Sequence, residues 1–193
     1  MLSSKAKAKD LVGSTVGKDL GAHEGVKGGG VFTVQCFDKD GNLKWETQKH
    51  NLVVNVGLKD MNDKYFTGAT YTAAWYIGVY GAGATNNPAA GDTAASHVGW
   101  TEVTAYSQAT RPQAVFAAAT TADPSVITNS ASPAVFSING TTVVGGAFLI
   151  NNNTKGGTTG VLFSASDFTS PGDRSVVNGD TLNVTYTFSL DAV

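Results

Sequence analysis

The amino-acid sequence predicts an all-β protein: a jelly-roll-like antiparallel β-sandwich with one short helix and an extended N-terminal arm. Gly, Ala, Thr, Ser, Asn and Val are abundant among the 193 residues, a composition typical of strands joined by tight turns. Residues 181–190 alternate between apolar and polar side chains, as expected of a strand with one buried face. Segments containing Gly, Asn and Pro separate many short apolar runs, which is the pattern of a sandwich or barrel.

The chain divides into a predicted arm, residues 1–30, and a predicted sandwich domain, residues 31–193. The arm mixes Lys, Gly and small residues and ends in three consecutive glycines at 28–30. It holds few large apolar side chains to offset the entropy of ordering it alone, so we expect it to be disordered or to lie across a neighbouring molecule. Its basic residues are the predicted partner contacts: Lys5, Lys7, Lys9, Lys18 and Lys27.

The sandwich domain begins with a predicted β-hairpin. Residues 31–37 are β-branched and aromatic, residues 38–42 form a polar stretch containing Asp-Gly, and residues 43–47 alternate again. Two such runs around an Asp-Gly turn are a strong hairpin signal. The Asp-rich stretch lacks the further spaced ligands and the terminal Glu of a calcium-binding EF-hand loop, so a turn is the better interpretation.

Residues 52–66 are the predicted helix. Apolar side chains recur there at approximately helical spacing, with Lys, Asp and Asn facing elsewhere. We expect Asn55 to cap the N-terminus of this helix and Gly68 to end it. The β-branched pair at 53–54 favours an extended start. The apolar face of the predicted helix consists of Leu52, Val56, Leu58, Met61, Tyr65 and Phe66.

Every element predicted beyond Gly68 is a strand. Neither the β–α–β rhythm of a parallel sheet nor an internal repeat is evident. Turn-rich loops are expected at residues 81–92, 151–159 and 170–179. The predicted strands are residues 73–80, 99–105, 112–119, 134–138, 142–150, 160–165 and 181–190.

Charged residues make up only 15% of the chain, against about 25% in an average protein. Ten of the thirteen basic residues lie between Lys5 and Lys64, so the remainder of the chain is poor in charge. Such a surface suits a subunit covered by partners better than a free monomer. The net charge of −2 gives no reason to expect nucleic acid as a partner, and no apolar run is long enough to indicate a membrane span.

No residue pattern indicates catalysis, so we expect neither an enzyme nor a bound cofactor or metal. The three histidines lack the spacing of a zinc site. Three aspartates near the C-terminal end could supply a glycosidase carboxylate pair, but each adjoins Gly, Ser or Thr at a strand edge, where Asp stabilises turns. The candidates weighed in this way are His23, His50, His97, Asp167, Asp173 and Asp180.

The tryptophans and the single cysteine support a second set of expectations. Trp45, Trp75 and Trp100 could form a sugar-binding platform if they were exposed together, as in a carbohydrate-binding module. Trp75 and Trp100 lie in apolar runs, however, so packing in the core is the default. Cys36 lies in an apolar, strand-like run, which predicts a buried and unreactive thiol.

Eight short motifs follow one another within the part of the chain from Val31 to Leu190. They are residues 51–58, 75–80, 91–93 and 100–102, then Tyr106 and Arg111, and finally residues 144–149 and 177–186. Their order resembles that of small structural proteins of tailed bacteriophages, which bind the particle as cement (decoration) or fibre-attachment components. The motifs mark a framework of strands and turns and not a site.

This resemblance implies a cement protein on the outer capsid surface of a virion. The implied partners are the major capsid protein and further copies of the chain, as a dimer or trimer, with the arm reaching across a subunit boundary. A tail or head fibre, or a receptor-binding component of the particle, is the alternative within the same family. A carbohydrate-binding module is the third hypothesis, and it rests on the tryptophans alone.

Overall fold

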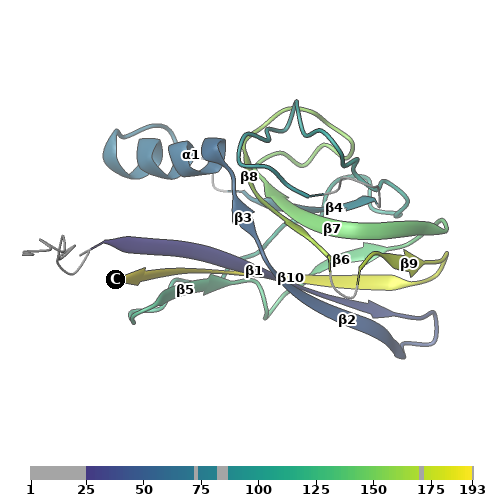
Figure 1. Cartoon of the computed structure of the whole chain (residues 1–193). Coiled ribbons are helices and arrows are strands. Elements are labelled where there is room, and N and C mark those ends of the chain that lie inside the picture. Colours follow the sequence, from purple (N-terminus) through teal and green to yellow (C-terminus); the bar gives the residue numbers. More distant parts are fainter. Residues whose placement is uncertain (1–24, 72–73, 82–86, 170–171, 193) are drawn as a thin grey trace, which may run out of the picture.

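The computed structural model describes residues 25–71, 74–81, 87–169 and 172–192, and shows two antiparallel sheets packed face to face (Figure 1). The predicted all-β sandwich is therefore confirmed, while the jelly-roll topology stays a prediction. The elements are β1 (Val26–Phe37), β2 (Leu43–His50), β3 (Leu52–Val53), α1 (Asn55–Phe66), β4 (Tyr76–Gly81), β5 (Ser125–Thr128), β6 (Ala134–Ser137), β7 (Thr142–Ile150), β8 (Leu162–Asp167), β9 (Arg174–Val176) and β10 (Thr181–Ala192).

The first sheet is built around the N-terminal and C-terminal strands. Its order is β2-β1-β10-β5, and β6 pairs with the beginning of β10 along the same edge as β5. Every second residue of β10 from Leu182 to Phe188 is buried, so the predicted alternation is confirmed. The strand continues two residues beyond the predicted end, because β1 offers it backbone partners as far as Ala192.

Strand β1 begins at Val26, five residues before the expected start of the sandwich. The glycines at 28–30, which the sequence predicts to end an arm, lie inside this strand, opposite residues 188–190 of β10. Gly30 must lack a side chain, because a Cβ there would lie 2.4 Å from the hydroxyl oxygen of Tyr186. Gly28 and Gly30 therefore mark close approaches between the strand and aromatic side chains of β10, while a Cβ at Gly29 would meet nothing within 4 Å.

The predicted turn between β1 and β2 is confirmed. The Asp38 carboxylate accepts the backbone N–H groups of Asp40 and Asn42, each at 2.9 Å. Gly41 has a φ of +84°, in the left-handed region that favours glycine. The hydrogen bonds donated by the backbone and side chain of Asn42 lower the pKa of Asp38.

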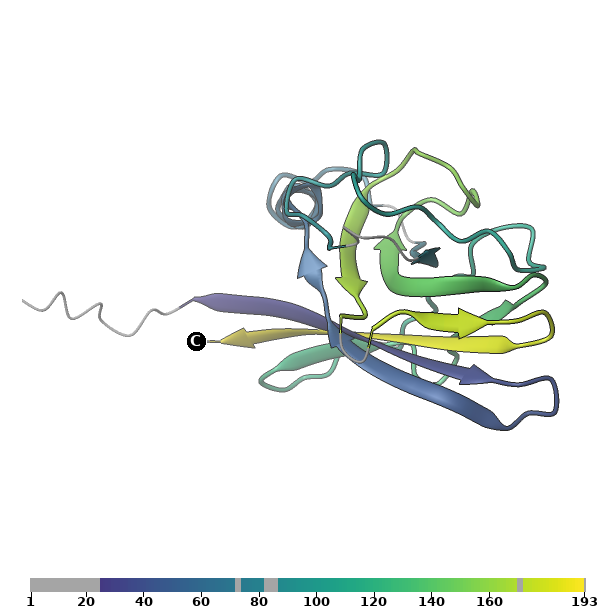
Figure 2. The same cartoon turned by 45° about the vertical axis from the view of Figure 1, so that its right-hand side comes forward.

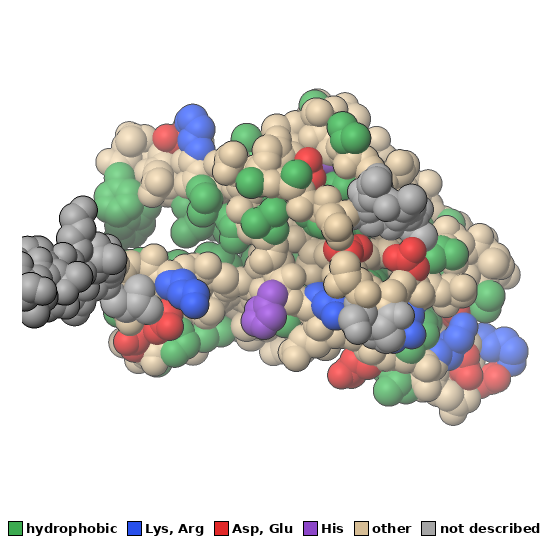
Figure 3. Space-filling model, viewed as in Figure 1, with side chains coloured by type: hydrophobic (Ala, Val, Ile, Leu, Met, Phe, Trp, Pro, Cys, Tyr) green, Lys and Arg blue, Asp and Glu red, His purple; other side chains and the backbone are tan. Residues whose placement is uncertain are grey.

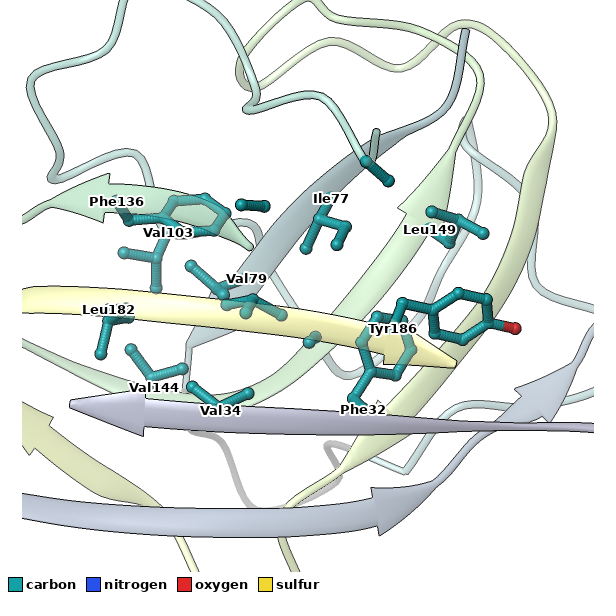
Figure 4. Packing of buried hydrophobic residues seen from close by; sticks show 14 of the residues in the cluster. Phe32, Val34, Ile77, Val79, Val103, Phe136, Val144, Leu149, Leu182 and Tyr186 are labelled. Atoms are coloured by element: carbon teal, nitrogen blue, oxygen red, sulfur yellow. The ribbon is translucent and has the colours of Figure 1, made fainter. Parts of the chain in front are cut away.

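The second sheet has the order β3-β8-β7-β4, with β9 paired to β7. Both of its faces are covered: one packs on the first sheet, and the other lies beneath loop segments that pack over the sheet (Figure 2). All seven residues from Val144 to Ile150 are consequently buried. The core between the sheets includes Phe32, Val34, Leu182 and Tyr186 from the first sheet and Ile77, Val79, Val144 and Leu149 from the second (Figure 4).

Two of the predicted strands are wrong. Residues 99–105 and 112–119 are irregular segments that each touch β4 through an isolated bridge, Tyr80 to Glu102 and Tyr76 to Gln113. Val103 and Ala114 of these segments pack in the main core, and Trp100 packs in the second hydrophobic cluster, without entering a ladder. The sequence pattern also failed to identify β5 and β9, which are only four and three residues long.

A buried ion pair holds the irregular segments in place. The Arg111 guanidinium makes two hydrogen bonds to the Glu102 carboxylate, at 2.9 and 2.8 Å, and both side chains are less than a tenth exposed. Two further N–H groups donate to the backbone carbonyls of Asn152 and Gly157, and the guanidinium carbon lies 5.3 Å from the centre of the Phe148 ring. Arg111 thus connects two loops to the outer face of the second sheet.

We predict that Glu102→Gln lowers the free energy of unfolding by about 3 kcal/mol, because it leaves a buried guanidinium without its counter-charge. Urea denaturation followed by tryptophan fluorescence measures this change. Lys59→Ala is the matched control, since it removes the exposed Lys59–Asp63 pair of α1 and should cost less than about 1 kcal/mol. Equal effects of the two variants would contradict the role assigned to Arg111.

Candidate binding groove at one end of the sandwich

Helix α1 stands beside the open end of the sandwich and is the only helix in the described residues (Figures 1 and 2). It begins one residue after Val54, which is extended and makes no side-chain capping bond. The expected cap by Asn55 is therefore wrong: Asn55 is the first helical residue. Gly68, with a φ of +70°, follows the last turn, in agreement with its predicted role as the stop.

The helix contacts β8 through Gly57, the one buried residue in it. A Cβ on Gly57 would lie 2.4 Å from the backbone carbonyl oxygen of Phe163, so only glycine permits this approach. The predicted apolar face is only partly turned inward: Val56 and Met61 are half-buried against the hydrophobic clusters. Leu58, Tyr65 and Phe66 are exposed. Periodicity alone could not reveal this, because the closest contact is made by a residue without a side chain.

A groove with a cavity volume of about 560 Å³ runs between α1 and the inner face of the first sheet. Figure 3 shows the corresponding hollow, with hydrophobic side chains on either side of it. Its floor and walls are mostly apolar and come from both sheets, α1 and the segment that precedes β5. The apolar residues that line it include Met61, Trp75, Val115, Phe116, Ile127, Tyr186 and Phe188.

Exposed aromatic residues stand at the end of α1 next to this groove. Tyr65 is 84% and Phe66 is 76% exposed, and their rings meet edge to face with centres 4.9 Å apart. Tyr71, which is 67% exposed, lines the groove itself. Lys64 Nζ lies 5.8 Å from the centre of the Tyr71 ring and 3.0 Å from Asp60 Oδ1. These exposed rings form a candidate contact surface.

A second hollow, of about 360 Å³, lies over the outer face of the second sheet. Trp100 is 5% exposed there, and its indole N–H donates to Asp92 Oδ2 at 3.0 Å. The His97 ring stacks on Trp100 at 3.9 Å between centres. Arg111 also lines this hollow and is paired with Glu102. The polar groups around this hollow therefore form hydrogen bonds and ion pairs that stabilise the loops.

The three tryptophans do not form a common platform. Trp100 is buried beneath loops, while Trp45 and Trp75 pack partly against the main core. Trp75 contacts the Phe163 ring edge to face, and Arg174 lies over Trp45. The default expectation of core packing is thus confirmed for Trp100, and the shared sugar-binding platform is excluded by the positions of the rings.

The predicted arm residues fall almost entirely outside the described part of the chain. Lys5, Lys7, Lys9 and Lys18 lie there, so the prediction for them stays a prediction. Lys27 is described: it is exposed in β1, with its backbone paired to that of Asp191 in β10. It lies near the start of β1, within the first sheet.

The candidate carboxylates take separate positions. Asp180 is buried, accepts the Val177 backbone N–H at 2.9 Å and the Lys44 ammonium at 2.6 Å, and so stabilises the turn before β10 as expected. Asp167 is half-buried in β8, and burial together with the nearby Asp173 raises its pKa. Among the described residues, no three His, Cys, Asp or Glu side chains lie close enough together to hold a metal ion.

Cys36 is fully buried in β1, as predicted. Burial, and then the neighbouring Asp180 carboxylate, raise the pKa of its thiol to about 11. Since the thiolate is the reactive form, this cysteine is unreactive at neutral pH.

Within the described residues, no helix is both long and apolar enough to cross a membrane. Comparison of the chain with models of protein families, with curated proteins and with solved structures finds no match. The likeness to phage structural proteins therefore rests on the motifs of the sequence.

We predict that Gly57→Ala destabilises the protein by about 1–3 kcal/mol, although alanine normally favours a helix over glycine by about 0.5–1 kcal/mol. The Cβ would have to displace the Phe163 carbonyl, which is backbone. Asn62→Ala, at an exposed position of the same helix, is the control and should change stability by less than about 0.5 kcal/mol. Urea denaturation measures both, and a more stable Gly57→Ala protein would refute the contact.

We predict that Asp167→Asn stabilises the protein at neutral pH and that this gain disappears on acidification. The folded-state pKa of Asp167 is raised, because burial disfavours its charged form. The stability that this group contributes is therefore fully present below the unfolded pKa of about 3.9, where the carboxyl is protonated, and is lost as the pH rises through the folded pKa. Unfolding midpoints of variant and parent across this range measure the difference. Asp40→Asn, in the exposed β1–β2 turn, controls for net charge; a gain for Asp167→Asn that does not vary with pH would contradict the assignment.

Proposed function

We propose that this chain is a non-enzymatic structural protein of a bacteriophage particle, which binds the outer surface of the capsid as a cement (decoration) protein. The observation that carries the proposal is the exposed aromatic pair, Tyr65 and Phe66, beside an apolar groove at one end of a rigid β-sandwich. The order of the sequence motifs, which resembles that of phage structural proteins, supports the assignment to a bacteriophage particle.

The surface of the molecule supports this function in a second way. Beyond Phe66 the chain has only three basic and seven acidic residues. Arg111, Asp92 and Asp180 are buried, so even fewer charges reach the surface than the sequence suggests. A surface with so little charge is suited to contact with a shell and with further copies of the chain, because the cores of protein interfaces are depleted in charged residues.

The exposed aromatic pair supplies the chemistry that such a contact needs. Aromatic side chains bury a large area with few rotatable bonds, and they dominate the binding energy of many interfaces. Because α1 is fixed to β8 through Gly57 and ends next to Gly68, the pair is presented on a rigid support. We assign these two rings to the capsid contact, with the basic residues before Val26 as a second contact.

The test is the amount and position of the chain in purified particles of the phage that encodes it. Gel quantification of separated heads and tails should find the chain on heads in numbers comparable with the major capsid protein. A few copies confined to tails would replace the cement proposal with a fibre, and absence from the particles would overturn both.

A binding measurement tests the surface. The double variant Tyr65→Ser/Phe66→Ser should bind particles stripped of the chain at least about tenfold more weakly, because each buried aromatic contributes more than 1 kcal/mol. Val135→Ser is the matched control, since Val135 is exposed on β6 and lies outside the groove lining. Both variants should unfold at the parent midpoint, and equal binding of all three proteins would show that the pair is not the contact.

A further inference from the structure

We propose that the groove beside α1 is occupied by the N-terminal segment of the same molecule, residues 11–20. This proposal concerns the chain alone and can be tested on the purified protein, so it succeeds or fails separately from the capsid function. Three observations carry it: the position at which the described chain begins, the length of chain that precedes it, and the pattern of apolar residues in that length.

The chain enters the fold close to the groove. Val26, the first residue of β1, pairs with Ala192. Phe188 in the groove floor lies four residues before Ala192 in β10. The distance along the strand is about 14 Å. The six residue steps from Leu20 to Val26 can span about 20 Å. Leu20 can therefore reach the level of Phe188, and the preceding residues can reach the rest of the groove.

The strand that borders this end cannot fill the groove itself. The inward-facing positions of β1 near its start are Gly28 and Gly30, which have no side chains. At Gly28 a Cβ would already lie 3.2 Å from the ring of Phe188. Phe188 itself is only 7% exposed, but Phe116 is half-buried and Val115 is 54% exposed, so apolar surface at the groove remains in contact with water, and a separate segment would cover it.

The segment before β1 has the matching pattern. Val12, Val16 and Leu20 are spaced four residues apart. Side chains at this spacing lie on one face of an extended strand and on neighbouring positions of one helix face, so either conformation presents an apolar stripe. Gly21 and Gly25, which flank the connection to β1, permit the chain to turn back.

The connection also favours the segment of the same molecule over that of a neighbour. A short flexible tether gives an effective concentration in the millimolar range, far above a protein concentration in the micromolar range. The segment that docks leaves Lys5, Lys7 and Lys9 outside the groove. These residues stay accessible to an acidic surface, as the predicted arm contacts require.

Disulfide trapping tests this arrangement in the full-length protein. Val16→Cys is combined with Val115→Cys, which lies at the groove and is 54% exposed. The control combines Val16→Cys with Val177→Cys, which is 43% exposed and precedes β10 at the opposite end of that strand. Cys36 is buried and does not compete.

Under mild oxidation, the groove pair should form an intramolecular disulfide several-fold faster than the control pair, seen as a shifted monomer band on a non-reducing gel. Equal rates for the two pairs would overturn the proposal. Disulfide-linked dimers that increase with protein concentration would also overturn it, because they would assign the groove to the segment of a second copy.

Binding of an environment-sensitive apolar dye provides an independent measurement. Deletion of residues 1–24, which leaves β1 intact, should raise dye fluorescence several-fold by opening the groove. Val16→Asp in the full chain should reproduce much of this rise, whereas Ser4→Asp, outside the apolar stripe, should not. Unchanged fluorescence in the deletion variant, with an unchanged unfolding midpoint, would show that the groove was already open.

Discussion

The ladder between β1 and β10 is the interaction on which the rest of the structure depends. It joins the first and last strands over twelve residue pairs and places them at the centre of the first sheet, so β2, β5 and β6 all attach to one or the other. From this ladder, Tyr186 reaches across the sandwich: its hydroxyl accepts a hydrogen bond from Asn51 at 2.8 Å and one from Ser164 at 3.4 Å. The two sheets are thus connected by a polar contact in addition to their apolar core.

Close packing around Tyr186 and around helix α1 requires glycine at two positions. Gly30 makes room for the Tyr186 hydroxyl, and Asn51 accepts the Gly30 N–H at 2.7 Å. Gly57 likewise permits α1 to approach the Phe163 carbonyl. Without side chains at these two positions, β1 lies close to the Tyr186 ring and α1 lies close to the backbone of β8.

The sequence predicts those elements whose signal is local. The alternation in β10 and the Asp-Gly turn at residues 38–42 depend on adjacent residues, and both are confirmed. Residues 99–105 look like a strand, but the Arg111–Glu102 pair, nine positions apart, holds them as a loop. The exposure of Tyr65 depends on which face of the helix meets β8. That face is set by the contact between Gly57 and the backbone carbonyl of Phe163, a residue far away in the sequence. The groove, which depends on several such contacts, could not be predicted.

The energetics of the aromatic pair show what a capsid contact would require. Two aromatic side chains bury about 150–250 Å² each, and at about 25 cal/mol/Å² this gives at most about 8–12 kcal/mol. Loss of translational and rotational freedom on association opposes this with about 4–15 kcal/mol. Tyr65 and Phe66 alone would therefore bind a shell weakly. A cement protein built on this sandwich would need a second contact in each molecule, which our proposal assigns to the basic residues before Val26 and to contacts between copies on a repeating lattice.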